Sequence, residues 1–216
     1  MTQRRNIAIS TSTSWYLRTI GAAARAVRTV AVIAASLITG LFVINSASAQ
    51  NGIEINTAFP GGKLTELSGM KTTLSVPAFA DEREIDDPRV IFTGEPAENG
   101  TAMADRPFAE IVGEAMENAF AASDARLADE GAGMRLAGTL IATEAAVIDR
   151  GGVESLQLTL RTSIQLVEGT RIVWQTKLFG RGTVPVSQGT GAAVRKALDR
   201  LAEELLIDDY FLAEIR

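Results

Sequence analysis

Residues 156–166 read Leu-Gln-Leu-Thr-Leu-Arg-Thr-Ser-Ile-Gln-Leu, the most regular pattern in the chain. Apolar and polar side chains alternate, which is typical of a β-strand with one buried face and one face in water. The apolar side chains are Leu156, Leu158, Leu160, Ile164 and Leu166; the polar ones are Gln157, Thr159, Arg161, Ser163 and Gln165. We interpret the polar row either as a plain wet sheet surface or as a surface that docks a partner or a polar ligand.

Two more strands are predicted on either side of this one, over residues 134–149 and 171–184. The connections are Arg150-Gly151-Gly152 and Glu168-Gly169-Thr170, which are short and contain glycine, as hairpins require. The three strands therefore form an antiparallel meander, and we interpret Trp174 on the last strand as a core residue.

A helix is predicted before the meander, because apolar residues recur there at spacings of three and four. Asp105 is its predicted N-cap, and Pro107 lies in its first turn. Its apolar stripe comprises Phe108, Ile111, Val112, Ala115, Met116, Ala119 and Phe120.

A second helix is predicted after the meander, beginning at Ser187 or Thr190. Its apolar stripe comprises Val194, Ala197, Leu198, Leu201, Ala202 and Leu205. A short helix over residues 208–215 follows, and we expect Tyr210, Phe211 and Ile215 to dock on the domain.

Residues 70–80 are predicted to form one strand with Leu74, Val76 and Ala78 on one face. Pro77 within it lacks an N–H donor, which indicates a sheet edge or a bulge. A short strand over residues 89–93 follows, and residues 94–104 are predicted to be a loop.

The order of these elements is strand, helix, three-strand meander, helix. Because the central strand has a wet face, both helices are expected to cover the other face of the sheet. The sequence therefore predicts an α+β fold, a two-layer sandwich with a mainly antiparallel sheet, rather than a doubly wound fold.

The first fifty residues are typical of a secretory signal peptide. They contain five arginines and no acidic residue, with an apolar run over residues 29–44. Ala47 and Ala49 are small residues at positions −3 and −1, so cleavage is predicted before Gln50. Retention as an uncleaved anchor is the alternative, although a helix of 16 residues spans only about 24 Å of a core of about 30 Å.

This pattern divides the chain into a signal peptide (1–49), a flexible N-terminal arm (50–69) and a single α+β domain (70–216). The expected location is the periplasm, with membrane association only through a retained signal segment or a partner.

Composition excludes several classes of function. The whole chain contains no cysteine and no histidine, which excludes disulfides, thiolate nucleophiles, imidazole bases and the usual zinc sites. After the signal segment, 26 acidic and 16 basic residues remain, a net charge of −10. Nucleic acid and anionic lipid are therefore unexpected partners. We predict a protein that is not an enzyme and uses no cofactor or metal.

Five acidic residues lie within residues 81–87. We interpret this segment as a solvated turn; the alternative, a calcium loop, would place carboxylates around a hard cation. Within it, Asp81 and Arg83 are two residues apart and would share one face of a strand. They are predicted to pair bidentately, either as an ion pair that holds the end of the strand or as a clamp for a polar ligand.

Two glycine-bearing stretches, Phe179-Gly180-Arg181-Gly182 and Gly189-Thr190-Gly191, are similar to phosphate-binding loops. Neither has the lysine and hydroxyl residue of a P-loop. We interpret the first as a strand end and the second as a helix start.

The residues also resemble the YajG family of small envelope lipoproteins. The similarity includes a strand ending in Ala80-Asp81-Glu82-Arg83 and the C-terminal Ala197-Leu198-Asp199, Leu205, Asp208, Phe211 and Ile215-Arg216. It covers residues 69–216. This resemblance implies an α+β module of the kind found in accessory components of envelope transport and assembly machines. The lipobox cysteine of the family is absent, and Ala47-Ser48-Ala49 occupies its place.

These observations predict an exported, non-enzymatic envelope accessory protein that binds another envelope protein or associates with itself. The alternative is a small-ligand carrier that uses the space between sheet and helices or a pocket lined by Phe108, Phe120 and Trp174. A hydrolase that uses only carboxylates would need two acids about 5–9 Å apart in a cleft.

Overall fold

The computed structural model describes residues 52–60, 65–97, 99–129 and 131–216. The predicted signal peptide and its cleavage site at Ala47, Ala49 and Gln50 lie outside these residues. Among the described helices, none has both the length and the apolar character needed to cross a membrane.

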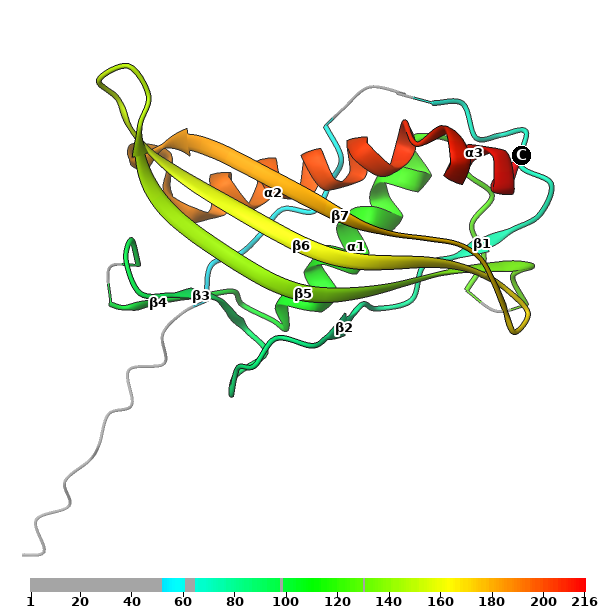
Figure 1. The fold of residues 1–216 in the computed structure, drawn as a ribbon, viewed down its shortest axis with the longest axis horizontal. Coiled ribbons are helices and arrows are strands. Elements are labelled where there is room, and N and C mark those ends of the chain that lie inside the picture. The colour runs from blue at the N-terminus through cyan, green and yellow to red at the C-terminus, as the bar shows by residue number, and fades with distance from the viewer. Residues whose placement is uncertain (1–51, 61–64, 98, 130) are drawn as a thin grey trace, which may run out of the picture. The chain divides into compact units, whose positions relative to one another are not determined.

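Three long antiparallel strands make up most of the large sheet and form the predicted meander (Figure 1). They are β5 (Met134–Asp149), β6 (Glu154–Glu168) and β7 (Arg171–Pro185). Leu160 on β6 pairs with Thr143 on β5 and with Gly180 on β7. Because alternate side chains point to opposite faces, this register directs the leucines of β6 to the core and its polar row to the outer face.

The predicted strand over residues 70–80 is instead two short pieces, each paired in parallel with β5: β1 (Leu74–Ser75) and β2 (Ala80–Asp81). Pro77 lies in the gap between them. The break changes the alternation, so that Phe79 is buried and Ala78 is exposed, contrary to the prediction. A residue without an N–H donor cannot continue the ladder, which explains the interruption.

A separate two-stranded sheet joins β3 (Val90–Thr93) to β4 (Thr101–Met103). The prediction of a loop over residues 94–104 is therefore wrong at its C-terminal end. Gly94 donates its N–H to the Gly100 carbonyl at 2.8 Å, and both glycines have positive φ angles. This glycine-dependent turn reverses the chain and brings β4 beside β3.

The helices lie on one side of the large sheet, which confirms the two-layer α+β sandwich (Figure 1). They are α1 (Phe108–Ala122), α2 (Gly189–Leu206) and α3 (Asp209–Ile215), with a 3-10 turn (η1, Val186–Gln188) before α2. Pro107, not Asp105, is the N-cap of α1, and the Phe108 N–H donates to the Pro88 carbonyl at 2.8 Å. The segment before the helix thus supplies the acceptor that a capping side chain would otherwise provide.

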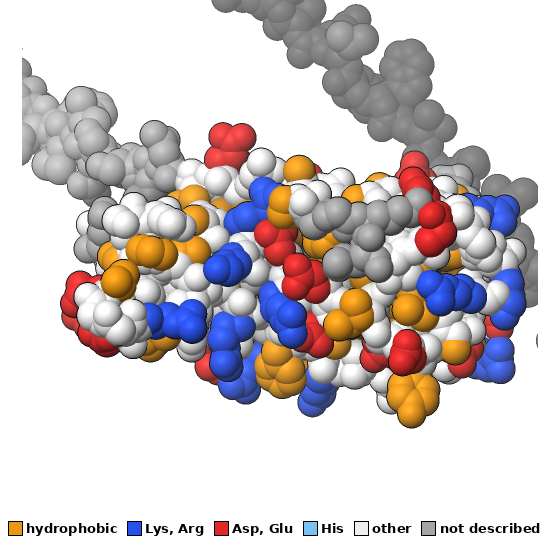
Figure 2. All heavy atoms as spheres, turned by 90° about the horizontal axis from the view of Figure 1, so that it is seen from above, with side chains coloured by type: hydrophobic (Ala, Val, Ile, Leu, Met, Phe, Trp, Pro, Cys, Tyr) orange, Lys and Arg blue, Asp and Glu red, His pale blue; other side chains and the backbone are white. Residues whose placement is uncertain are grey.

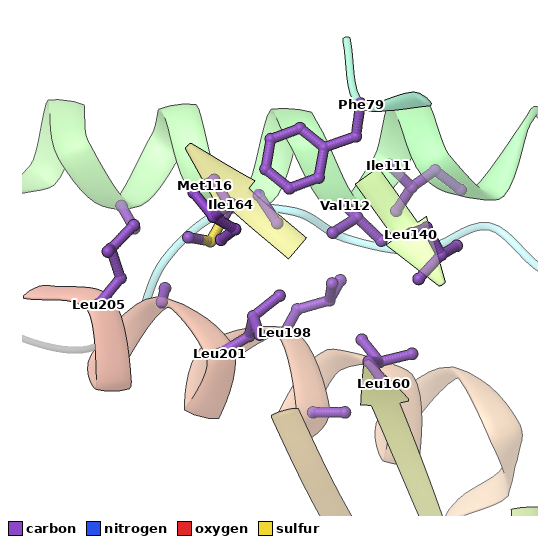
Figure 3. Packing of buried hydrophobic residues seen from close by; sticks show 14 of the residues in the cluster. Phe79, Ile111, Val112, Met116, Leu140, Leu160, Ile164, Leu198, Leu201 and Leu205 are labelled. Carbon is purple, nitrogen blue, oxygen red and sulfur yellow. The ribbon is translucent and has the colours of Figure 1, made fainter. Parts of the chain in front are cut away.

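The core lies between the helices and the inner face of the sheet. In Figure 3, side chains from α1, α2 and the strands point toward one another, among them Val112, Leu140, Leu160 and Leu198. Both predicted apolar stripes are buried, as are Phe211 and Ile215 of α3. The expected docking of Tyr210 is wrong, because this side chain is 81% exposed.

Gly180 and Gly182 lie near the C-terminal end of β7, which ends at Pro185, one residue beyond the predicted strand. A Cβ at Gly182 would lie 2.0 Å from the Ala193 carbonyl oxygen of α2, and one at Gly180 would lie 2.2 Å from that of Ala197. These two glycines therefore allow α2 to approach the strand more closely than any side chain would permit. The other stretch, Gly189 to Gly191, does begin a helix, as predicted.

Parts of the segment predicted to be an arm pack on the domain. The Ile53 N–H donates to the Met103 carbonyl at 2.7 Å, and Ile53 accepts from the Asp105 N–H at 3.2 Å. Ile55 and Leu67 are buried in the core. Residue 53 thus forms a bridge beside the end of β4.

Candidate functional site

Asp81 and Arg83 form a bidentate ion pair where β2 ends. Arg83 donates from Nε to Asp81 Oδ1 at 2.9 Å and from Nη2 to Oδ2 at 2.7 Å. The Arg83 backbone N–H donates to the same Oδ1 at 3.1 Å. The short spacing in the sequence therefore closes a local ring that holds the chain as it leaves the sheet.

Arg83 also connects this segment to three other elements. Its Nη1 donates to the Val90 carbonyl of β3 at 2.6 Å and contacts Thr143 Oγ1 of β5 at 3.3 Å. The guanidinium lies over the ring of Phe108 on α1, 5.4 Å from its centroid. Only 4% of the Arg83 side chain is exposed. Its donors are thus used within the protein, which favours a structural role over a ligand clamp.

The pKa of Asp81 reflects two opposing effects. Burial raises the pKa of the carboxyl, whereas the hydrogen bonds and the positive charge of Arg83 lower it, and the net result is a pKa below the ordinary value of 3.8. Asp81 is therefore ionised at neutral pH. It acts as the counter-ion of a buried arginine.

The acidic turn contains a second pair of the same kind, which sequence reasoning missed. Arg89 donates to both carboxylate oxygens of Asp87, at 3.1 and 2.7 Å. The signal that would have found it is the repeat of Asp-x-Arg. In the described part of the chain, no three acidic side chains come together as a cation site would require.

Other carboxylates with shifted pKa values are also paired with arginine. Glu114 pairs with Arg106, and a hydrogen bond from Thr57 is the main cause of its lowered pKa. Asp199 pairs with Arg195 at 3.2 Å, and burial raises its pKa despite that partner. These carboxylates belong to structural ion pairs, each with a cation beside it.

The polar row of β6 lies on the outer face of the sheet, between β5 and β7. The pairs across to β7 are Gln157 with Thr183, Thr159 with Arg181, Arg161 with Phe179, Ser163 with Lys177 and Gln165 with Gln175. Of the β6 row, Arg161 is exposed, Thr159 is buried, and the others are half-buried. The structure thus brings all five predicted residues onto one face with the outward residues of β7.

Arg161 lies at the centre of this outer face. It forms an ion pair with Glu144 of β5 at 3.0 Å, and its guanidinium lies 5.7 Å from the ring centroid of Phe179 on β7. Phe179 is 53% exposed, although it is a large hydrophobic side chain. Sequence reasoning missed Phe179 because it took this segment as a strand end; continuing the alternation of β7 past Leu178 would have found it.

A pocket of about 520 Å³ lies elsewhere, where α2 begins. Its walls come from Ile53, from the turn and strand around Pro96 and Met103, and from Val186 and Gly191. Of the three residues predicted to line a pocket, Phe108 and Phe120 are buried in the core, and Trp174 packs against it. Phe211 fills the space there, with ring centroids 5.8 Å from Phe120 and 5.1 Å from Trp174.

No family model matches this chain, and no curated protein matches it either. Among solved structures, protein XCC0632 from Xanthomonas campestris, of the family DUF330, is 19% identical with a TM-score of 0.49. That match covers 68% of this chain and 90% of the other. A PelC dodecamer from Paraburkholderia phytofirmans is 17% identical with a TM-score of 0.35, covering 68% and 91%. Both TM-scores are below 0.5, so we assign the chain to neither group, and the resemblance to the YajG family stays a prediction.

Proposed function

We propose that this protein is a non-enzymatic accessory protein of the cell envelope that binds another protein through the outer face of its sheet. The observation that carries the proposal is the exposed Phe179 beside Arg161, on the face of the sheet opposite the helices (Figure 1). Aromatic and arginine side chains are enriched where proteins bind one another.

The rest of the outer face fits a protein partner. Polar side chains surround Phe179, which matches an interface with a small apolar centre and a polar rim. Figure 2, a view from the side where α2 and α3 lie, shows basic, acidic and hydrophobic side chains intermixed, with no single apolar centre singled out there. The outer sheet face is therefore our choice for the docking surface.

The residue composition and the ion pairing of the carboxylates support a role other than catalysis. The N-terminal sequence supports export. The sequence contains no histidine or cysteine, and Asp81, Asp87, Glu114 and Asp199 each pair with arginine. Location in the envelope rests on the N-terminal sequence, with its arginines, apolar run and small residues.

The test is capture of the C-terminally tagged protein from its native envelope after mild crosslinking, with mass spectrometry of the bound proteins and of the N-terminus. We expect one envelope protein to be captured by the wild type and lost with Phe179→Ser. Tyr210→Ser, a change at an exposed aromatic residue on α3, is the matched control and should keep the partner. Equal capture by both variants would contradict docking on the sheet. An N-terminus at Gln50 is expected.

A second candidate function, a small-ligand carrier, is favoured by the pocket at the start of α2. Its volume of about 520 Å³ is within the usual size of ligand sites, and apolar side chains such as Ile53, Met103 and Leu156 line it. Native mass spectrometry of protein purified from its own envelope tests this function. Added mass that disappears in Ala102→Phe, where a larger side chain would fill the pocket, supports a carrier; an unliganded mass contradicts it.

A further inference from the structure

Strand β7 forms one edge of the large sheet. The strand order is β1-β5-β6-β7, so β6 pairs with one side of β7 and no described strand pairs with the other. Helix α2 packs on the inner face of β7, at Gly180 and Gly182. The side chain of Lys196 on α2 also donates to the Thr183 carbonyl at 3.3 Å.

An open edge of this length is a template for another strand. β7 is 15 residues long, whereas strands commonly have about five or six. The backbone N–H and C=O groups of β7 that point away from β6 pair with no described strand. Such a row of donors and acceptors is what extended segments of other proteins use in strand addition.

The charges along β7 differ from those of the rest of the protein. Residues 171–185 contain Arg171, Lys177 and Arg181 and no acidic residue, although the chain beyond the signal segment carries a net charge of −10. A second copy of β7, paired antiparallel about Phe179, would place Lys177 opposite Arg181. Like charges directly opposite one another destabilise a strand pair, so the edge favours an acidic strand over a second β7.

We propose that β7 binds an extended acidic segment of the partner protein as an additional strand of the sheet. This inference rests on the proposed function and deepens it, because it names the kind of segment that docks. Lys177, Phe179 and Arg181 pair with successive outer-face residues of β6 and therefore share that face. The added strand then presents acidic, apolar and acidic side chains at alternate positions.

The probe is a fluorescein-labelled peptide, Thr-Glu-Thr-Phe-Thr-Glu-Thr, whose binding to the full protein is followed by fluorescence anisotropy. A matched peptide carries lysine in place of both glutamates. We expect the acidic peptide to bind about tenfold or more tightly than the basic one. The double variant Lys177→Glu/Arg181→Glu should reverse this preference, whereas Lys71→Glu/Arg150→Glu, with the same change in net charge, should keep it.

Backbone pairing is tested with two further peptides, N-methylated at the even or at the odd positions. Each blocks hydrogen bonding along one edge of the peptide. Strand addition predicts that one of them loses binding while the other keeps it, because only one edge faces β7. Equal binding by both, or equal binding of the acidic and basic peptides, would overturn the proposal. If Phe179→Ser still abolishes envelope capture in that case, the interaction function stands and only strand addition is wrong.

Discussion

The segments Asp81-Glu82-Arg83 and Asp87-Pro88-Arg89 form the same local ion pair in different surroundings. In each, the arginine donates its backbone N–H, Nε and Nη2 to the aspartate two residues earlier, with distances between 2.7 and 3.1 Å. Arg83 is 4% exposed and also contacts Val90 and Phe108, whereas Arg89 is 43% exposed. The local geometry is therefore equal, and only the surroundings differ.

The difference shows how surroundings give an ion pair its energetic importance. An exposed pair is surrounded by water, which replaces either partner at little cost. Water cannot reach a buried pair in this way. Removing one partner therefore leaves the other charge, and several hydrogen-bonding groups, without a partner inside the protein. We therefore expect the two motifs to respond very differently to the same substitution.

The largest effect is expected from Arg83→Ala compared with Arg89→Ala. Arg83→Ala leaves the Asp81 carboxylate and the Val90 carbonyl without their donor, and should lower the free energy of unfolding by about 3 kcal/mol. Arg89→Ala should leave urea unfolding almost unchanged. The contrast fails if both variants unfold at the same urea concentration. If Arg83→Ala melts normally and loses only partner binding, Arg83 is a ligand clamp.

Gly182→Ala tests how strongly close packing between two elements affects stability where no charged group is involved. Its Cβ would lie 2.0 Å from the Ala193 carbonyl oxygen and 2.6 Å from the Ala197 nitrogen, so α2 must shift away from β7. We expect the free energy of unfolding, measured by thermal unfolding, to fall by about 1–3 kcal/mol. Arg181→Ala, one residue away on the outer face, is the control and should melt like the wild type. A stable Gly182→Ala would show that α2 moves freely.

Thr143 and Thr162 extend the comparison from ion pairs to neutral hydroxyl groups, one with a hydrogen-bond partner and one with none that the structure describes. Thr143 Oγ1 donates to the Ile91 carbonyl, whereas Thr162 Oγ1 is buried and has no partner among the described residues. Thr143→Val should destabilise the protein by about 1 kcal/mol, and Thr162→Val should stabilise it by a similar amount. Chemical denaturation of both variants measures the difference, and shifts of the same sign would refute it.

The smallest expected effect is the pH dependence of the two aspartates. The pKa values of Asp81 and Asp87 are below their ordinary value of 3.8, so their ionised forms stabilise the fold above about pH 4. This stability is lost as the pH falls through the lowered pKa values. Asp81→Asn and Asp87→Asn should therefore differ from the wild type at pH 7 and converge with it toward pH 2. High salt should reduce the Asp87 difference more, because that pair is exposed.

The sequence predicted the elements whose pattern is local. The alternation over residues 156–166, the glycine-bearing turns and the apolar stripes of α1 and α2 all depend on neighbours within a few residues, and the structure contains them. The Asp81–Arg83 pair was also visible, since the two residues lie two positions apart. The outer-face row of β6 followed from the same alternation.

Errors arose where distant segments decide the structure. Three features depend on contacts between segments that are distant in the sequence. They are the parallel pairing of β1 and of β2 with β5, the burial of Phe79, and the pairing of β4 with β3. The need for the glycines of β7 was not visible locally, because the helix that requires them lies further along the chain. Phe179 is a different case, because continuing the local alternation past Leu178 would have placed it on the outer face.

The amino-acid sequence by itself determined the meander, the two main helices and the sandwich class. The reason is that the hydrophobic period of a strand or helix is set by residues only a few positions apart in the chain. Tertiary structure alone decided which of two identical Asp-x-Arg motifs is buried, why β7 has glycines, and that Phe179 meets Arg161 on an open face. These outcomes depend on packing between segments that are distant in sequence, and the free energy of burial depends on what those segments place around each group.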